Sequence, residues 1–272
     1  MPGIGLISRE GSPTAEAARA EAAAWLAAHG RSAVMLTRES SPAGLDLVIA
    51  FGGDGTLLGA AHAVAVAGLD VPVLGINLGH LGFLTEVSRA EMLDALQAVL
   101  DGRTHTETRL MLRGRVERDG QIVAERLALN DIVLTRGALS RMIEVDVSVD
   151  SLLVTHVKAD GVIVATATGS TAYNLSAGGP IVLPSVDAMV LTPIAPHALS
   201  NRPVVLPATA TVVLRPAIDP QEDLVATFDG QFGVGLLPGD AIVVTRADRV
   251  VTLLRVTNRT HFDMLREKLR WG

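Results

Sequence analysis

The sequence contains no cysteine, which excludes disulfide scaffolds, thiolate zinc sites and cysteine nucleophiles. Aromatic side chains make up only 3% of the 272 residues, so the hydrophobic 49% must form a mainly aliphatic core. No uninterrupted apolar stretch reaches the ~18 residues that a membrane-spanning helix needs. The first residues also lack the basic start and apolar run of a signal peptide. We therefore expect a soluble, cytoplasmic protein without membrane contact.

Excess positive charge is lacking too. The formal net charge is −6, which argues against a protein that coats nucleic acid or binds anionic membranes. The histidines are scattered, and no pair has a zinc-binding spacing with a nearby acid, so no zinc site is expected. The length suffices for two modest domains.

The N-terminal part of the chain alternates strand and helix patterns. Short apolar runs at Ile4–Ser8 and Val71–Asn77 are typical of buried strands. Helices are predicted over Ser12–Gly30, from near Thr56, and over Ser88–Gly102, the first with Ser12 as its cap and Pro13 in its first turn. Alternating strands and helices predict a Rossmann-like parallel sheet with helices on its faces.

The pattern then changes to an apolar–polar alternation with a period of two. Asp119-Gly120 marks a hairpin turn, and only the segment after Thr171 has helical spacing. We expect an α/β domain over residues 1–104, to which a helical tail at 257–272 returns. Residues 105–256 are expected to form a β-rich domain of two packed sheets, a β-sandwich.

The first stretch with chemical content is GGDGT, Gly52–Thr56, between a predicted strand and a predicted helix. Such glycines let backbone N–H groups approach phosphate oxygens. The stretch lacks the Lys-Ser/Thr pair of a P-loop and is not a G-x-G-x-x-G motif. Its exposed acid, Asp54, could anchor a phosphate-bound Mg²⁺ or accept a proton from an attacking hydroxyl, so the stretch indicates phosphoryl transfer. For a lone short glycine motif, however, an ordinary strand–helix turn is the more common explanation.

The second stretch, Lys158–Pro180, is rich in uncharged hydrogen-bonding side chains around the only tyrosine, Tyr173. These side chains are Thr168, Ser170, Thr171, Asn174 and Ser176. They suit ribose hydroxyls and base edges, but a polar helix-capping segment explains them equally well.

The ordered set of motifs resembles the NAD kinase family over nearly the whole chain. GGDGT is followed by the pair Asn130-Asp131 and by DGVIVATATGSTAYNLSAGGP. Four further blocks match in the family's order: NLGHLGFLTE, LTPIAPHALSNRP, FDGQ and LREKLRW. GGDG alone is shared with lipid kinases and, more loosely, phosphofructokinases, whereas TGSTAY with the following Gly-Gly-Pro is not.

The resemblance implies transfer of a phosphoryl group from ATP or polyphosphate to the adenosine ribose 2′-hydroxyl of NAD, giving NADP. It implies Mg²⁺ that enters with the nucleotide and no permanently bound metal. The family is commonly dimeric or tetrameric, so a homodimer or homotetramer is expected. The alternatives are a GGDG-type lipid or sugar kinase, which should lack the TGSTAY loop, and a non-catalytic dinucleotide-binding regulator, which could lack Asp54.

The resemblance also implies site residues. Asp54 would be the base, beside Gly52, Gly53 and Gly55, and Arg141 would bind donor or dinucleotide phosphates. The residues implied to bind NAD are Phe83, Asn130, Asp131, Lys158, Asp160, Thr171, Ala172, Tyr173, Ser176, Ala195 and Gln231. Among them, the 171–176 residues and Ala195 would line the adenosine, with Phe83 at the adenine. Lys158 and Asp160 would lie near the nicotinamide, and Gln231 would close the site.

Three positions depart from the family pattern. Asp131 stands where glutamate is common, which shortens the carboxylate by one methylene, and Ala167 stands where proline is frequent. Gly59 replaces a frequent arginine and removes an assumed phosphate contact, which Arg141 could supply instead. None of the three removes the chemistry.

Overall fold

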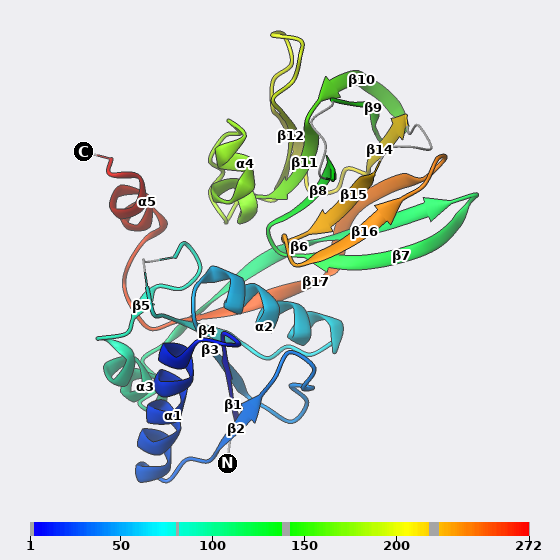
Figure 1. Ribbon diagram of the computed structural model, residues 1–272. Helices are drawn as coiled ribbons and strands as arrows, with labels where there is room; N and C mark the ends of the chain where they lie inside the picture. The colour runs from blue at the N-terminus through cyan, green and yellow to red at the C-terminus, as the bar shows by residue number, and fades with distance from the viewer. Residues whose placement is uncertain (1–2, 80–81, 138–141, 218–222, 272) are drawn as a thin grey trace. The chain divides into compact units, whose positions relative to one another are not determined.

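The computed structural model describes residues 3–79, 82–137, 142–217 and 223–271 and divides into two compact units (Figure 1). Unit 1 comprises residues 1–108 and 251–272, and unit 2 comprises residues 109–250. Two long strands, β6 (His105–Arg118) and β17 (Ala241–Arg255), each begin in one unit and end in the other.

Unit 1 is built on a parallel sheet with the strand order β4-β3-β1-β2. A short strand, β5, pairs with β4, and Leu253 of β17 pairs with Val73 of β4. The elements of this part are β1 (Ile4–Ser8), α1 (Pro13–Ala28), β2 (Ala33–Leu36), β3 (Leu47–Phe51), α2 (Asp54–Val66), β4 (Val73–Asn77), β5 (Val87–Ser88) and α3 (Met92–Leu100). The predicted α/β fold of the N-terminal part is confirmed.

The strand order fixes where the helices lie. The chain moves across the sheet in one direction from β1 to β2 and in the opposite direction from β3 to β4. Because such crossovers are right-handed, α1 and α2 cover opposite faces, as Figure 1 shows. The carboxyl ends of β1 and β3 are in register at Ser8 and Phe51, so the loops that follow them emerge side by side. Ligands of open α/β sheets bind at this edge.

The helix starts agree with the sequence to within a few residues. Ser12 accepts a hydrogen bond from the Ala15 N–H and Pro13 begins α1, as predicted. Helix α2 begins at Asp54 rather than near Thr56. Helix α3 begins at Met92 because Ser88 and Glu91 bond reciprocally, the Ser88 N–H to Glu91 Oε2 at 2.9 Å, and form a turn ahead of it.

Unit 2 consists of two antiparallel sheets that share one core. One sheet has the order β13-β12-β11-β8-β15-β16, and the other contains β10-β9-β14-β17, with β6 pairing both β17 and β7. Buried aliphatic side chains from both sheets, among them Val164, Leu191, Val147 and Leu214, form this core. The predicted β-sandwich is therefore confirmed.

The other elements of unit 2 lie between β6 and β17 in the sequence. They are β7 (Gln121–Ala128), β8 (Asp131–Arg136), β9 (Ile143–Val149), β10 (Leu152–Ala159), β11 (Gly161–Thr166), the 3-10 turn η1 (Gly169–Thr171), α4 (Tyr173–Ser176), β12 (Ala188–Ile194), β13 (Val204–Pro207), β14 (Val212–Ala217), β15 (Leu224–Phe228) and β16 (Phe232–Leu236). None of the helices in the described ranges is long and apolar enough to cross a membrane.

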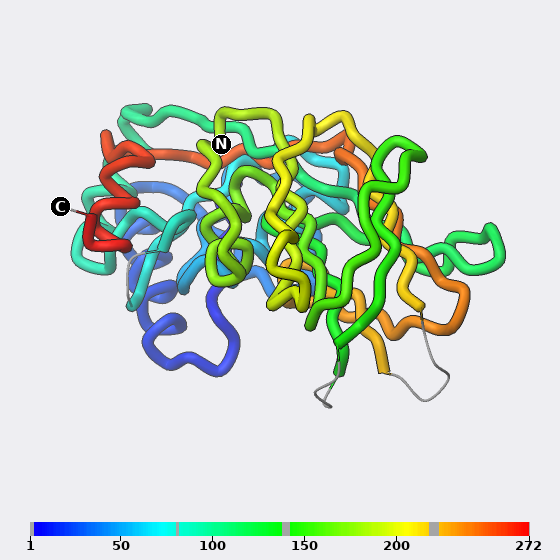
Figure 2. The backbone as a smooth tube through the Cα atoms, turned by 90° about the horizontal axis from the view of Figure 1, so that it is seen from above, coloured from blue at the N-terminus to red at the C-terminus, as the bar shows by residue number. Residues whose placement is uncertain are grey.

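The C-terminal helix α5 (His261–Leu269) belongs to unit 1, as the sequence predicted. It begins with a capping box in which Thr260 and Asp263 bond each other's backbone N–H groups. Just before it, Arg259 Nη1 donates to the Glu86 carbonyl at 2.7 Å. Figure 2 shows the helix, in red, beside the cyan segment that contains Phe83, and Lys268 Nζ lies 4.9 Å from the centre of the Phe83 ring.

Candidate active site

Asp54 is the first residue of α2, and its carboxylate is held by four donors from one distant segment. Oδ1 accepts hydrogen bonds from the N–H groups of Leu84 (3.1 Å) and Thr85 (3.0 Å) and from Thr85 Oγ1 (2.9 Å). Oδ2 accepts one, from the Phe83 N–H at 2.8 Å. The sequence suggested an exposed acid among the amides of its own glycine loop, whereas the structure places it, half-buried, against residues 83–85.

The two carboxylate oxygens are therefore unequal. Oδ1 is saturated by three donors, while Oδ2, across the described parts of the chain, receives a single hydrogen bond and keeps a lone pair. Packing leaves Asp54 little freedom, because a Cβ on Gly82 would lie 1.9 Å from Oδ1. Asn77 Nδ2 in turn donates to Thr85 Oγ1 at 2.9 Å, which fixes that hydroxyl as a donor toward Asp54.

A cavity of about 340 Å³ opens at the carboxyl ends of β1, β3 and β4. The loops that follow these strands line it, through Arg9, Ser12, Thr14, Ala15, Gly52, Gly53, Asn77, Leu78 and Gly79. Arg9 brings a positive charge, and no side chain of the described residues caps the N-terminus of α2 at Gly53. A Cβ on Gly52 would lie 2.2 Å from Thr56 Oγ1, whereas Gly53 faces open space. Such an arrangement suits an anion.

In unit 2 the structure brings the Asn130-Asp131 pair against the TGSTAY turn. The Thr166 N–H donates to the Asn130 carbonyl at 2.8 Å, and Thr166 Oγ1 donates to the Leu129 carbonyl at 2.6 Å. The approach is so close that a Cβ on Gly169 would lie 2.0 Å from the Asn130 carbonyl oxygen. Only glycine fits there, which explains the G of TGSTAY.

The polar side chains of this turn divide into two groups. Ser170 and Asn174 are buried and bond the surrounding backbone: Ser170 Oγ donates to the Ala167 carbonyl (2.7 Å), and Asn174 Nδ2 donates to the carbonyls of Ser170 (3.0 Å) and Pro180 (3.1 Å). By contrast, Tyr173 is 44% exposed and Ser176 is exposed. The explanation as a polar capping segment therefore holds for Ser170 and Asn174, whereas Tyr173 and Ser176 are free to contact a ligand.

Asp229, in the FDGQ block, holds the Asn130-Asp131 pair in place. Its carboxylate accepts the N–H groups of Leu129 (2.8 Å), Asn130 (2.7 Å) and Asp131 (3.1 Å), and its own N–H donates to the Asp131 carbonyl at 2.9 Å. Burial, and then the charge of Asp229, raises the pKa of Asp131 to about 7. Burial likewise raises the pKa of Asp229. Gln231 follows two residues later, with its N–H on the Phe228 carbonyl.

Lys158, Asp160 and Ala195 form a separate group. The Asp160 N–H donates to the Ile194 carbonyl at 2.9 Å, so these residues lie together where β11 begins. The TGSTAY turn lies where β11 ends, which at ~3.3 Å per residue puts about 20 Å between the two groups. Lys158 Nζ lies 2.5 Å from Glu144 Oε1, and this contact lowers the pKa of Glu144. Arg141 lies outside the described residues.

The sequence motifs did not identify three residues that hold or line these sites. Thr85 and Asp229 lie inside the blocks NLGHLGFLTE and FDGQ, so the family resemblance pointed to their segments but not to their roles. Arg9 follows the first strand without any motif around it. Throughout residues 3–79, 82–137, 142–217 and 223–271, no cluster of three or more His, Asp or Glu side chains could hold a metal ion.

Family models match both parts of the chain. The ATP-NAD kinase N-terminal domain matches residues 8–104, and the ATP-NAD kinase C-terminal domain matches residues 129–256. The chain belongs to the NAD kinase family. It is 41% identical to the NAD kinase of Citrifermentans bemidjiense over 100% of this chain and 99% of that protein. The NAD kinase of Syntrophotalea carbinolica is 46% identical over 86% of this chain and 81% of its own length.

Solved structures of the family share the fold. An NAD kinase from Archaeoglobus fulgidus, solved with ATP, matches with a TM-score of 0.79 and 26% identity over 99% of this chain and all of that one. A yeast NADH kinase, solved with NADH, matches with a TM-score of 0.87 over 100% of this chain and 88% of its own; at 24% identity it shows the fold alone. The kinase phosphorylates NAD to NADP with ATP, as predicted, and the lipid or sugar kinase alternative has no support.

Proposed function

We propose that Asp54 is the general base of this reaction and that Oδ2 is the oxygen that takes the proton of the ribose 2′-hydroxyl. The observation that carries the proposal is the unequal occupancy of the two oxygens: Oδ1 is held by three donors and Oδ2 by one. A ribose hydroxyl is a poor nucleophile, and phosphoryl transfer gains from a positioned acceptor for its proton. The three donors on Oδ1 fix the carboxylate so that Oδ2 presents its lone pair.

The cavity beside Gly53 is the proposed place of the donor phosphates. Arg9 and the N-terminus of α2 supply positive potential there, and a cavity of about 340 Å³ can hold a chain of phosphates. Either ATP or polyphosphate fits this description, because both present the same phosphate chain. Mg²⁺ would enter with the donor, since one arginine does not neutralise a triphosphate. We expect turnover with ATP to cease in excess EDTA and to return on adding MgCl₂; full turnover in EDTA would contradict this.

Unit 2 is the proposed source of most NAD contacts. Thr171, Ala172, Tyr173 and Ser176 would line the adenosine, and Asn130, Asp131 and Gln231 are further members of the set that the family resemblance implies. The same resemblance implies Phe83 and Gly55 in unit 1. Exposure of Tyr173 and Ser176 beside the buried, hydrogen-bonded Ser170 and Asn174 supports this assignment. Replacing Tyr173 by alanine should raise KM for NAD, with stacking worth about 1–3 kcal/mol, and leave KM for ATP unchanged.

The decisive experiment for the base is Asp54→Asn. The amide keeps the shape of the side chain but cannot take a proton, so kcat should fall by roughly 10²–10⁴. NAD affinity, measured by calorimetry on the same preparation, should stay within a few-fold of the parent. Asp94→Asn, an exposed acid on α3, is the matched control and should leave both quantities unchanged. A near-parental kcat in Asp54→Asn would show that Asp54 is not the base.

We also propose that the kinase works as a homodimer or homotetramer. Lys158, Asp160 and Ala195 lie at the opposite end of β11 from the TGSTAY turn, so a second copy could complete each NAD site with them. The edge strand β10 exposes Leu152 and Leu153, 73% and 67% exposed, and an uncovered apolar edge favours pairing with another copy.

Light scattering on a sizing column tests the oligomer directly. Leu153→Glu should reduce the mass to that of one chain and raise KM for NAD, while Ile122→Glu, an exposed apolar residue on β7, should change neither. A parental protein with the mass of a single chain would refute the proposal. The cytoplasmic location remains a prediction of the sequence.

A further inference from the structure

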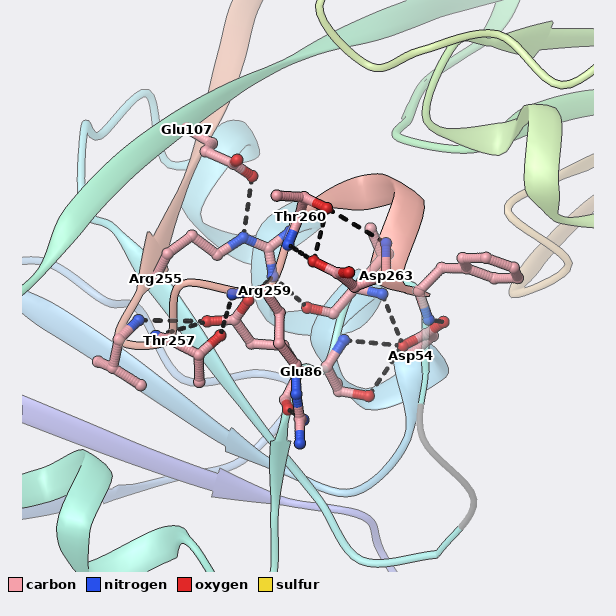
Figure 3. A network of polar contacts seen from close by, with 12 residues as sticks. Asp54, Glu86, Glu107, Arg255, Thr257, Arg259, Thr260 and Asp263 are labelled. Carbon is pink, nitrogen blue, oxygen red and sulfur yellow. Dashed lines mark hydrogen bonds and ion pairs between the residues drawn. The ribbon is translucent and has the colours of Figure 1, made fainter. Parts of the chain in front are cut away.

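Arg255 is a buried arginine with three partners, one of which, Leu84, lies in the segment that holds Asp54. It ends β17, and its side chain is 8% exposed (Figure 3). Nη1 donates to the Leu84 carbonyl at 2.9 Å and lies 3.5 Å from Glu86 Oε2, and Nε donates to Glu107 Oε2 at 2.9 Å. Two carboxylates thus orient the guanidinium so that one of its N–H groups points at a single backbone carbonyl.

That carbonyl belongs to the peptide group that binds the proposed base. The C=O of Leu84 and the N–H of Thr85 are the two ends of one planar peptide, and the Thr85 N–H donates to Asp54 Oδ1 at 3.0 Å. A charged donor on the carbonyl end polarises the peptide and strengthens the hydrogen bond at its N–H end. The guanidinium therefore acts on the carboxylate through one peptide unit, without touching it.

The neighbouring contacts keep the Leu84–Thr85 peptide from rotating. Glu86 Oε1 accepts the N–H groups of Val256 (3.2 Å) and Thr257 (3.3 Å), and Arg259 Nη1 donates to the Glu86 carbonyl at 2.7 Å. Side chains of residues 255–259 thus donate to backbone carbonyls of residues 84–86, and the Glu86 side chain accepts from the backbone of residues 256 and 257, as the dashed lines of Figure 3 show. Of the contacts between the two segments, the one from Arg255 to Leu84 falls on the peptide that binds Asp54.

We propose that Arg255 is a positioning residue for the catalytic carboxylate: it fixes and polarises the Leu84–Thr85 peptide, which holds Asp54 Oδ1 so that Oδ2 faces the ribose hydroxyl. The proposal rests on the role of Asp54 as the base. Arg255 would affect the rate and not NAD binding, because its partner Leu84 also donates its own N–H to Asp54 and none of its partners is a residue assigned to the adenosine. A buried ion pair is also weak evidence for a purely stabilising role.

The test is a double-mutant cycle with Arg255→Lys and Asp54→Asn. Lysine keeps the charge but lacks the planar guanidinium that contacts Leu84, Glu86 and Glu107 at the same time. The Leu84–Thr85 peptide therefore loses its fixed donor. We expect kcat to fall by about 10–100-fold, since a small misplacement of a reacting group has effects of that order, with KM for NAD nearly unchanged. In the Asp54→Asn background the same substitution should leave kcat nearly unchanged, because the group it positions is no longer a base.

The matched control is Arg118→Lys. Arg118 forms a two-pronged pair with Asp240 in unit 2, at 2.7 and 2.8 Å, so it resembles Arg255 in chemistry but touches no proposed site residue. Its kcat should equal that of the parent, whatever its effect on the melting temperature. Hydrogen exchange adds a readout independent of activity: the Thr85 amide should exchange faster in Arg255→Lys than in Arg118→Lys.

The outcomes separate the two proposals. If Asp54→Asn alone keeps a near-parental kcat, the base assignment fails and the role of Arg255 fails with it. If Asp54→Asn is slow but Arg255→Lys loses the same factor in both backgrounds, or raises KM instead of lowering kcat, only the positioning role is overturned. If Arg255→Lys does not fold, Glu107→Gln replaces it in the cycle, because it loosens the guanidinium from its half-exposed partner; additive losses would again overturn the proposal.

Discussion

Ionisation of Asp131 should cost the folded protein several kcal/mol at neutral pH. The carboxyl is 5% exposed and lies next to Asp229, and together burial and that charge raise its pKa to about 7 from an ordinary 3.8. Each pKa unit corresponds to 1.36 kcal/mol, so the ionised form costs about 4 kcal/mol at pH 8. Asp131→Asn removes the titrating group and keeps its shape, and should therefore relieve most of this cost.

The direction with pH follows from proton binding. Between pH 4 and 7 the folded state holds a proton on Asp131 that the unfolded chain has released, so the free energy of unfolding falls as pH rises. The contribution of the protonated carboxyl is complete below its unfolded pKa and is lost by the time pH has passed the folded value. Between pH 5 and 8 the parent should thus lose about 3 kcal/mol relative to Asp131→Asn.

Urea unfolding at constant ionic strength, from pH 5 to pH 8, measures this difference. Asp229 is present in both proteins, so the pH dependence of the difference reports mainly on Asp131. Unfolding curves of parent and variant that stay equally far apart at every pH would refute the reasoning, because they would show that Asp131 titrates alike in the folded and unfolded chains.

Three further substitutions test the surroundings of the two sites. Gly82→Ala places a Cβ 1.9 Å from Asp54 Oδ1, so kcat should fall at least about tenfold, whereas Gly235→Ala, which meets nothing within 4 Å, should keep the parental kcat. Asn174→Ala leaves Thr192 Oγ1 and two carbonyls without their partner; we expect a loss of about 2–4 kcal/mol in urea unfolding, and a loss below 1 kcal/mol would contradict the network. Asp229→Asn removes a charge beside Asp131 and should shift the pH profile of KM for NAD toward lower pH; an unshifted profile would speak against their coupling.

The sequence predicts best the features that depend on neighbouring residues. The cap at Ser12 and the stop at Gly30, whose φ of 71° suits glycine, bound α1 closely because both signals act within one turn. The period-two pattern likewise predicts the sheets of unit 2, since alternation alone decides which side chains face the core. Family motifs then locate Asp54 and the TGSTAY turn.

The contacts that make the sites work could not be predicted in this way. Asp54 meets Thr85, Asp229 meets Asn130 and Arg255 meets Leu84 across separations of 31, 99 and 171 residues. Each joins a side chain to a backbone group. Because nearly every residue offers the same backbone N–H and C=O groups, the residue type of the partner does not reveal the contact. The burial of Ser170 and Asn174 has the same origin, because their side chains bond the backbone carbonyls of Val182 and Pro180.

The path of the chain through unit 1 has a consequence for biosynthesis. A ribosome makes the β1–β4 region and Asp54 first, but the guanidinium that is proposed to position the base comes from residue 255, after the whole of unit 2. The β1–β4 region of a nascent chain is therefore complete before the arginine that is proposed to position its carboxylate has been made. The Arg255–Leu84 contact can form only after β17 has been made, so the proposed positioning of Asp54 is a late step in the folding of unit 1.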